Sequence, residues 1–174
     1  MVIQIDSREK ARAITKIIST FDAQHIDHLT SKLPFGDYMS YDNPRLIIDR
    51  KQNLSELCSN LYDEPERDEL GYVKRYDDGT PKTAKRRFFR ELEGAQKYGI
   101  KMIILCEHGR TVKSMADVAK WVNPRLKESP MAMSGERLAK MLTVISKKYN
   151  VDFVFCEKHQ TGKKIIELLA GEGT

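Results

Sequence analysis

Two acidic residues at neighbouring predicted strands constrain this chain more than any other feature. The first, Asp37, belongs to a Gly-Asp-Tyr segment, and the second, Asp49, follows the apolar run at 46–48. Such a run is typical of a strand buried on both faces. Because side chains alternate along a strand, Lys51 shares a face with Asp49, whereas Arg50 points the other way. The chain must therefore bring two carboxylates and an ammonium group together beside one sheet.

Converging carboxylates repel each other unless a cation lies between them, and oxygen ligands of this kind are those that Mg²⁺ prefers. We therefore predict that Asp37 and Asp49 are metal ligands for Mg²⁺ or Mn²⁺. Lys51 would orient or deprotonate an attacking water, or stabilise charge that develops on a phosphate. This set suits hydrolysis of a phosphodiester. The alternative is two surface acids in turns or ion pairs, beside a solvated lysine.

Strands and helices alternate through the rest of the chain, which predicts a single α/β domain over residues 1–174 with a mixed sheet flanked by helices. Ser7 is expected to cap the first helix and Asn53 the second. The segment at about 62–83 is polar and is expected to be a mobile insertion. The expected strands are 2–6, 26–30, 36–41, 45–50, 102–106 and 153–156, and the later helices are a basic one after 83, 114–122, 135–148 and one from Thr161.

Composition limits the class of protein. A chain of 174 residues, 40% hydrophobic and 32% charged, is long enough for one buried core. No apolar run is long enough to cross a bilayer, and the first residues do not resemble a signal peptide. The three cysteines are scattered, which fits a reducing cytoplasm. A net charge of +5 permits nucleic-acid binding without requiring it.

Three motifs, in this order, resemble those of the XPF–Mus81–Hef nuclease family within the restriction-endonuclease-like superfamily. They are Ile5-Asp6-Ser7-Arg8-Glu9, Gly36-Asp37-Tyr38 and Ile47-Ile48-Asp49-Arg50-Lys51. An arginine-led helix that runs into a strand over residues 87–107 is similar to the family's next helix–strand pair. The family usually has Glu in place of Asp49, and it favours Asp where this chain has Ser55 beside Glu56.

The resemblance implies a divalent-metal-dependent endonuclease that cuts branched or flapped DNA in repair or recombination. It also implies a homodimer. The compact form resembles phage and bacterial versions, hence the cytoplasm of a bacterial or phage-infected cell. We expect the domain to stand without the helix-hairpin-helix module that often follows such nuclease domains, and a separate DNA-binding protein would then supply that function. The alternatives are a catalytically silent DNA-binding or partner-binding subunit on the same fold, and a sequence-specific or junction-resolving nuclease.

Further charged residues have roles that the sequence leaves open. Arg50 is expected to hold Asp6, Glu9 or another carboxylate, or to contact the scissile region, although a structural ion pair fits equally. Glu9 falls early in the first predicted helix, where an acid suits the helix dipole, and Asp6 ends the first strand. Supporting catalytic and structural roles stay open for both acids. A basic cluster could bind DNA phosphates or form a solvated helix face: it comprises Lys85, Arg86, Arg87 and Arg90.

Overall fold

A computed structural model describes residues 1–62, 64–84 and 87–171. Within these residues, six strands form one mixed sheet in the order β2-β1-β3-β4-β7-β8. The strand β3 is antiparallel to both of its neighbours, and the remaining pairs are parallel. The predicted mixed sheet is confirmed. The strands are β1 (Val2–Asp6), β2 (Asp27–Ser31), β3 (Tyr38–Ser40), β4 (Asn43–Lys51), β7 (Lys101–Glu107) and β8 (Val151–Cys156).

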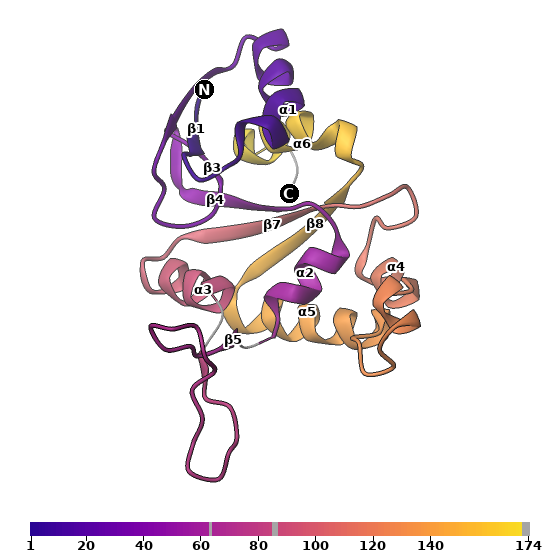
Figure 1. Cartoon of the computed structure of the whole chain (residues 1–174). Coiled ribbons are helices and arrows are strands. Elements are labelled where there is room, and N and C mark those ends of the chain that lie inside the picture. The colour runs from indigo at the N-terminus through magenta and orange to yellow at the C-terminus, as the bar shows by residue number, and fades with distance from the viewer. Residues whose placement is uncertain (63, 85–86, 172–174) are drawn as a thin grey trace.

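Helices cover both faces of the sheet (Figure 1). One face carries α1 (Ala11–Ala23) and α6 (Thr161–Ala170), which lie side by side. The other carries α2 (Leu54–Asn60), α3 (Arg87–Lys97) and α5 (Gly135–Tyr149), with α4 (Met115–Lys120) packed against α5. Short 3-10 helices lie at Pro124–Lys127 and Lys158–Gln160.

The strand β7, which lies between β4 and the edge strand β8, contributes side chains to both hydrophobic cores. Met102, Ile104 and Cys106 pack with the helices of one face, while Ile103 and Leu105 pack with α1 and α6 on the other. A parallel strand covered by helices on both faces is expected to be apolar throughout. The adjacent strand β4 is equally buried from Ile47 onward, but its last three residues are charged. Charged side chains therefore lie where the buried sheet ends.

The first helix begins later than the sequence predicts. Ser7 is not its cap, because α1 starts at Ala11 with Lys10 at the N-cap. The Asp6 carboxylate accepts the Arg8 N–H (2.7 Å), and the Glu9 N–H donates to the Asp6 carbonyl (3.0 Å), so these residues form a turn. The placement of Glu9 in the helix is likewise wrong. By contrast, the Asn53 cap of α2 is confirmed by its bond from the Glu56 N–H (2.8 Å).

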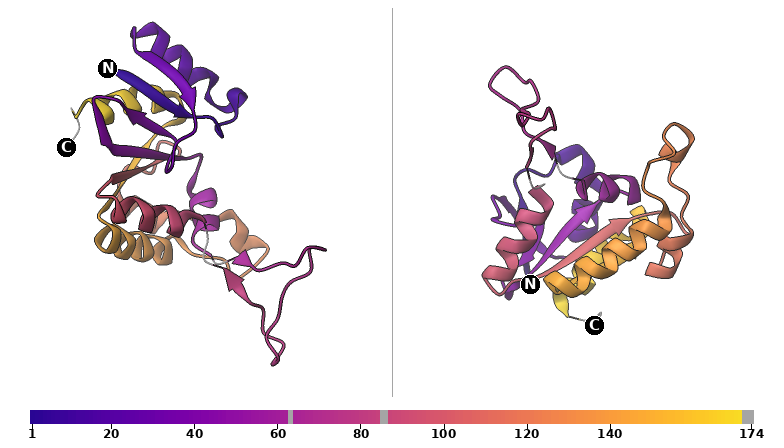
Figure 2. Two further views of the ribbon diagram at one scale, coloured as in Figure 1. Left: turned by 90° about the vertical axis from the view of Figure 1, so that its left-hand side faces the viewer. Right: turned by 90° about the horizontal axis from the view of Figure 1, so that it is seen from below.

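The segment between α2 and α3, which we call the arm (residues 64–84), projects from the body of the molecule (Figure 2). Its ends pair as β5 (Glu64–Pro65) and β6 (Thr83–Ala84). A ring of three backbone hydrogen bonds closes it: Glu66 N–H to Lys82 O (2.8 Å), Lys82 N–H to Lys74 O (2.9 Å) and Lys74 N–H to Glu66 O (2.8 Å). The arm is thus two successive eight-residue loops, and its expected mobility stays a prediction.

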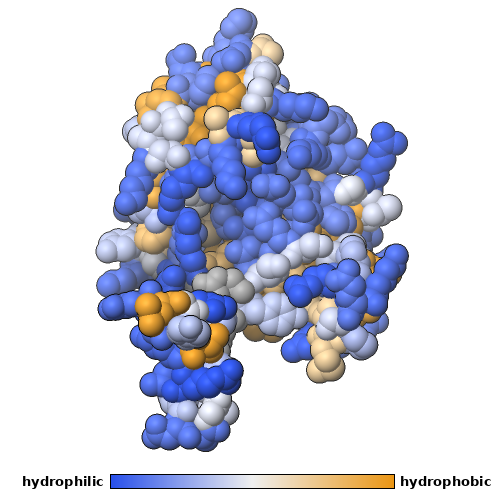
Figure 3. Space-filling model, viewed as in Figure 1, coloured by the Kyte–Doolittle hydropathy of each residue, from blue (hydrophilic) through white to orange (hydrophobic). Residues whose placement is uncertain are grey.

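Apolar side chains on the arm are unusually exposed. Leu70 is 82% exposed, Tyr72 70% and Tyr76 57%. Figure 3 shows hydrophobic surface on this projecting segment, whereas the centre of the same face is hydrophilic. No helix among the described residues is long and apolar enough to cross a membrane.

Candidate active site

The two predicted metal ligands and the lysine line one cleft of about 230 Å³. Asp49 and Lys51 come from the end of β4, and Asp37 comes from the turn just before β3. The adjacent walls come from the turn after β1, from α2 and from the first turns of α3. The lining residues are Arg8, Glu9, Asp37, Asp49, Arg50, Lys51, Glu56, Asn60, Arg87, Phe88 and Glu91.

Lys51 and Asp49 form a buried ion pair. Lys51 Nζ lies 2.8 Å from Asp49 Oδ1 and 2.7 Å from Oδ2, and it also lies 5.5 Å from the centroid of the Phe88 ring. Burial alone would lower the pKa of Lys51, but the charge of Asp49 and its hydrogen bond raise that pKa overall. Lys51 is therefore an ammonium donor in this state, which favours orienting water or stabilising anionic charge over removing a proton.

Asp37 is held by backbone on both sides. Its Oδ2 accepts the Arg50 N–H (2.7 Å), its own N–H donates to the Ile48 carbonyl (2.8 Å), and its carbonyl accepts the Asp6 N–H (2.8 Å). Burial, followed by the charges of Asp49 and Glu9, raises the pKa of Asp37 well above its usual range. This carboxylate therefore lies in a buried site where the neighbouring acids further disfavour its charged form.

Gly36 allows this approach to β4. Its φ is +59°, and a Cβ at that position would clash with Ile47 Cγ2 and lie 2.9 Å from the Ile48 carbonyl oxygen. Glycine alone adopts such a conformation at no steric cost. The Gly-Asp pair thus places the Asp37 carboxylate against the charged end of β4.

Arg50 joins two carboxylates from distant parts of the chain. Its Nη2 and Nε lie 2.7 and 3.1 Å from Glu9 Oε2, and its Nη1 lies 3.1 Å from Glu107 Oε1. The Tyr38 hydroxyl also donates to Glu9 Oε2 (3.2 Å). Burial would lower the pKa of Arg50, but Tyr38, Glu9 and Glu107 raise it, so the guanidinium stays charged. Of the carboxylates proposed for Arg50, the structure places Glu9 against it.

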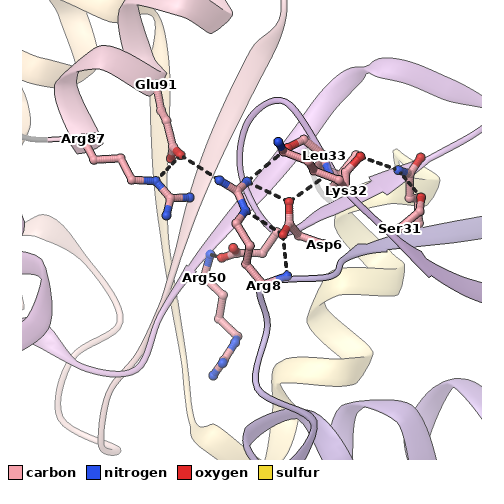
Figure 4. A network of polar contacts seen from close by, with 10 residues as sticks. Asp6, Arg8, Ser31, Lys32, Leu33, Arg50, Arg87 and Glu91 are labelled. Atoms are coloured by element: carbon pink, nitrogen blue, oxygen red, sulfur yellow. Dashed lines mark hydrogen bonds and ion pairs between the residues drawn. The ribbon is translucent and has the colours of Figure 1, made fainter.

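Asp6 binds Arg8 and does not contact Arg50, which holds Glu9 and Glu107. Its carboxylate accepts Arg8 Nε (2.7 Å), Arg8 Nη2 (2.7 Å) and the Arg8 and Leu33 N–H groups (2.7 and 2.9 Å). Burial would raise the pKa of Asp6, but these donors lower it. Arg8 continues to Glu91 (3.9 Å), which pairs with Arg87 (2.6 Å), as Figure 4 shows. Asp6 therefore anchors one wall of the cleft through Arg8.

The predicted DNA-binding cluster lies only partly within the described part of the chain. Lys85 and Arg86 fall outside the described residues. Arg87 begins α3 at the rim of the cleft with 56% of its side chain exposed, and Arg90 is also exposed on that helix. These two positions place positive charge next to the acids.

The donor set fits a hard divalent cation. Among residues 1–62, 64–84 and 87–171, no three His, Cys, Asp or Glu side chains converge enough to hold a metal by themselves. Magnesium, however, commonly takes only one or two carboxylates, with waters and substrate phosphates completing its shell. Asp49 Oδ2 is buried and, apart from its ion pair with Lys51, accepts no hydrogen bond in the described part of the chain. Burial, followed by the charges of Asp49 and Glu9, raises the pKa of Asp37, and a cation between the acids would offset those charges.

Sequence reasoning missed three residues of this network. Glu107 could have been predicted from the sequence, because it is the first acid after the apolar run of β7. Since β7 pairs in parallel with β4, this acid lies beside the end of β4. Thr161 and Glu91 carried no comparable signal, since only the tertiary fold brings them to Glu107 and Arg8. The outermost acid, Glu56, lines the cleft, and its Oε2 accepts the Gln52 N–H (2.7 Å).

A family model for the ERCC4 domain matches residues 5–169, which include every motif described above. The chain belongs to the ERCC4 domain family. The predicted membership of the XPF-type nuclease group is confirmed. No curated protein matches this chain.

Solved structures agree on the fold. XPF from Aeropyrum pernix is similar with a TM-score of 0.62 and 16% identity over 99% of this chain and 65% of that one. XPF from Aeropyrum pernix in complex with DNA gives a TM-score of 0.61 and 16% identity, over 98% and 64%. The predicted restriction-endonuclease-like fold is thereby confirmed, and this ERCC4 domain spans about two thirds of either matched chain.

Proposed function

We propose that this ERCC4 domain is a divalent-metal-dependent endonuclease that hydrolyses phosphodiester bonds in branched or flapped DNA. The observation that carries the proposal is the single cleft in which Asp37, Asp49 and Lys51 meet. Membership of the ERCC4 family supports a nuclease, and the similar XPF structure with DNA supports nucleic acid as the substrate. Recognition would rest on DNA shape and phosphate contacts, because neither requires a base-specific code.

Asp37 and Asp49 would hold Mg²⁺ or Mn²⁺, which would supply Lewis acidity and neutralise charge near the scissile phosphate. The Lys51 ammonium would donate to the attacking water or to the phosphate oxygens, where charge increases during attack. The Arg50 backbone fixes Asp37, and its guanidinium fixes Glu9 at the rim of the same cleft. Arg87 and Arg90 would contact the DNA backbone beside the cleft.

The partner of the site is therefore DNA, and a homodimer or a separate DNA-binding protein would extend the contact surface. The apolar sides of α5 and α6 that are not used in the core offer one such surface. For α5 this includes Val144, which is 63% exposed. Sedimentation of the chain with and without branched DNA would measure its oligomeric state directly.

Cleavage of labelled duplex, flap, fork and four-way-junction DNA with Mg²⁺, Mn²⁺ or EDTA tests the proposal, with Asp37→Asn as the matched variant. The asparagine retains an oxygen that can accept the Arg50 N–H, so only the charge is removed. We expect metal-dependent cutting by the wild type and none by the variant. Thermal unfolding supplies a second readout: Mg²⁺ should stabilise the wild type and not Asp37→Asn. Binding without cleavage under either metal would instead support the catalytically silent alternative.

A further inference from the structure

The C-terminal helix reaches the cleft through a chain of buried hydrogen bonds. Thr161, the first residue of α6, donates its hydroxyl to Glu107 Oε1 (2.9 Å). The same oxygen lies 3.1 Å from Arg50 Nη1, and Arg50 Nη2 lies 2.7 Å from Glu9. Thr161 is fully buried, and Glu107 and Arg50 are 3% and 5% exposed. The helix α6, the strands β7 and β4 and the turn after β1 are thus joined by side chains that are buried, except for the partly exposed Glu9.

The direction of each bond follows from the available hydrogens. A carboxylate only accepts, so the Thr161 hydroxyl must donate to Glu107, and the Cys156 thiol (3.7 Å) can donate to the Thr161 oxygen in turn. The Lys158 carbonyl lies 3.1 Å from the same hydroxyl, but the charged acceptor is favoured. The second Glu107 oxygen has no hydrogen-bond partner among the described residues. Glu107 is therefore held through Oε1 alone.

Close helix packing sets the position of the hydroxyl. Gly162 follows Thr161, and a Cβ there would lie 2.7 Å from Thr20 Cβ in α1. The absence of a side chain lets the first turn of α6 approach α1 and brings Thr161 over the carboxyl end of β7. A hydroxyl placed by two packed helices is rigid, which is what an orienting group requires.

We propose that Glu107 and Thr161 are positioning residues for the nuclease reaction, acting through Arg50. Arg50 touches the cleft twice: its N–H donates to Asp37, and its guanidinium holds Glu9. Displacement of Glu107 lets the guanidinium shift between its two carboxylates, and this moves Glu9 and the β4 backbone that supports Asp37. Neither residue contacts the reacting atoms. The inference rests on the proposed nuclease function.

The decisive variants are Thr161→Val, which keeps the shape and removes the hydroxyl, and Thr161→Ser, which restores it. Ile165→Val is the matched control, because Ile165 is fully buried in α6 among apolar side chains and takes no part in the hydrogen-bond chain. Steady-state cleavage of flapped DNA gives kcat and KM, and thermal unfolding gives stability. We expect Thr161→Val to lower kcat about tenfold with KM within about twofold, the pattern of a group needed in the transition state. Thr161→Ser should recover kcat, and Ile165→Val should lose stability without losing kcat.

A second readout is independent of cleavage. The Nε–H resonance of Arg50 in ¹⁵N NMR, assigned by its loss in Arg50→Lys, should be sharp in the wild type and in Thr161→Ser. It should shift and broaden in Thr161→Val. If Thr161→Val does not fold, Glu107→Gln replaces it with the same expectation for the resonance. An unchanged resonance together with wild-type kcat would overturn the inference, as would equal losses in Thr161→Val and Thr161→Ser. A wild type that cuts no DNA would refute the nuclease function, while the resonance would still test the positioning of Arg50.

Discussion

The cleft and the arm are both rich in charged residues, yet they are built in opposite ways. In the cleft, Arg50 bonds residues that are 13, 41 and 57 positions away in sequence. In the arm, Arg67 bonds Gly71 and Arg75 bonds Gly79, each four positions away. A contact between residues far apart in sequence must offset the entropy lost in closing a long loop, whereas a contact between residues four positions apart closes only a short one. The cleft should therefore be sensitive to substitutions that the arm tolerates.

Two lysines that each lie over an aromatic ring give the largest expected contrast. Lys51 lies 5.5 Å from Phe88 and is 8% exposed, whereas Lys82 lies 5.1 Å from Tyr76 on the arm. Lys51→Ala leaves the Asp49 charge buried and unpaired, which should cost about 3–5 kcal/mol in the free energy of unfolding. It should also lower kcat by about 10²–10³-fold. Lys82→Ala should cost less than about 1 kcal/mol.

The double variant Asp49→Ala/Lys51→Ala sharpens this contrast. It removes both charges, so it should recover much of the stability that Lys51→Ala loses, although it should not restore cleavage. Denaturant unfolding and flap cleavage measure the two effects separately. A double variant no more stable than Lys51→Ala would show that the ion pair is not the reason for the loss.

A second contrast uses two glycines with positive φ. Gly36 has φ +59° and is packed against Ile47 and Ile48, whereas Gly79 on the arm has φ +82° and open space, with no atom within 4 Å of where a Cβ would lie. Both Gly→Ala variants bear a left-handed backbone cost of about 1–2 kcal/mol. Only Gly36→Ala adds overpacking, typically about 1–3 kcal/mol more. Equal unfolding free energies for the two variants would contradict the close approach of Gly36 to β4.

The sequence predicted the layers of this fold because its periodic apolar runs are long and regular, as in β7 and α5. The convergence of Asp37, Asp49 and Lys51 could also be predicted, since the alternation of side chains along β4 and the Gly-Asp turn are properties of short sequence segments. The start of α1 could not. Ser7 is a good cap by composition, but the Asp6 carboxylate binds Arg8 and Leu33, and the second contact exists only in the folded chain.

The same limit explains why residues of the hydrogen-bond network behind the cleft were missed. Glu107 and Thr161 are 54 positions apart, and their contact depends on how α6 packs against α1. No local pattern contains that information. The ring of three hydrogen bonds in the arm was missed for a different reason: the backbone forms it at an eight-residue spacing, and the side chains of the two loops differ.

The pH dependence of metal binding gives a smaller effect, confined to the cleft. Because the pKa of Asp37 is raised, the folded state holds this proton more tightly than the unfolded chain does. The stabilisation from that proton is complete below the ordinary carboxyl pKa and is lost as pH rises through the raised value. Mg²⁺ competes for the deprotonated form, so its stabilising effect, about 1.4 kcal/mol at tenfold excess over Kd, should disappear as pH falls through the raised value. Unfolding temperatures with and without Mg²⁺, measured from neutral pH down to the ordinary carboxyl pKa, follow this loss, and Asp37→Asn should show no such dependence.

The smallest expected effect lies on the arm itself. Tyr72→Ala/Tyr76→Ala removes two rings that are 70% and 57% exposed, so the unfolding free energy should change by less than about 0.5 kcal/mol per site. Tyr38→Phe is the matched change in the cleft, where the hydroxyl donates to Glu9 and its loss should cost about 1–2 kcal/mol. The double arm variant should also leave kcat unchanged, because the arm's side-chain hydrogen bonds described above are local. A fall in kcat with stability preserved would mean that the arm acts on the cleft, and the two regions would then be one functional unit despite their separate construction.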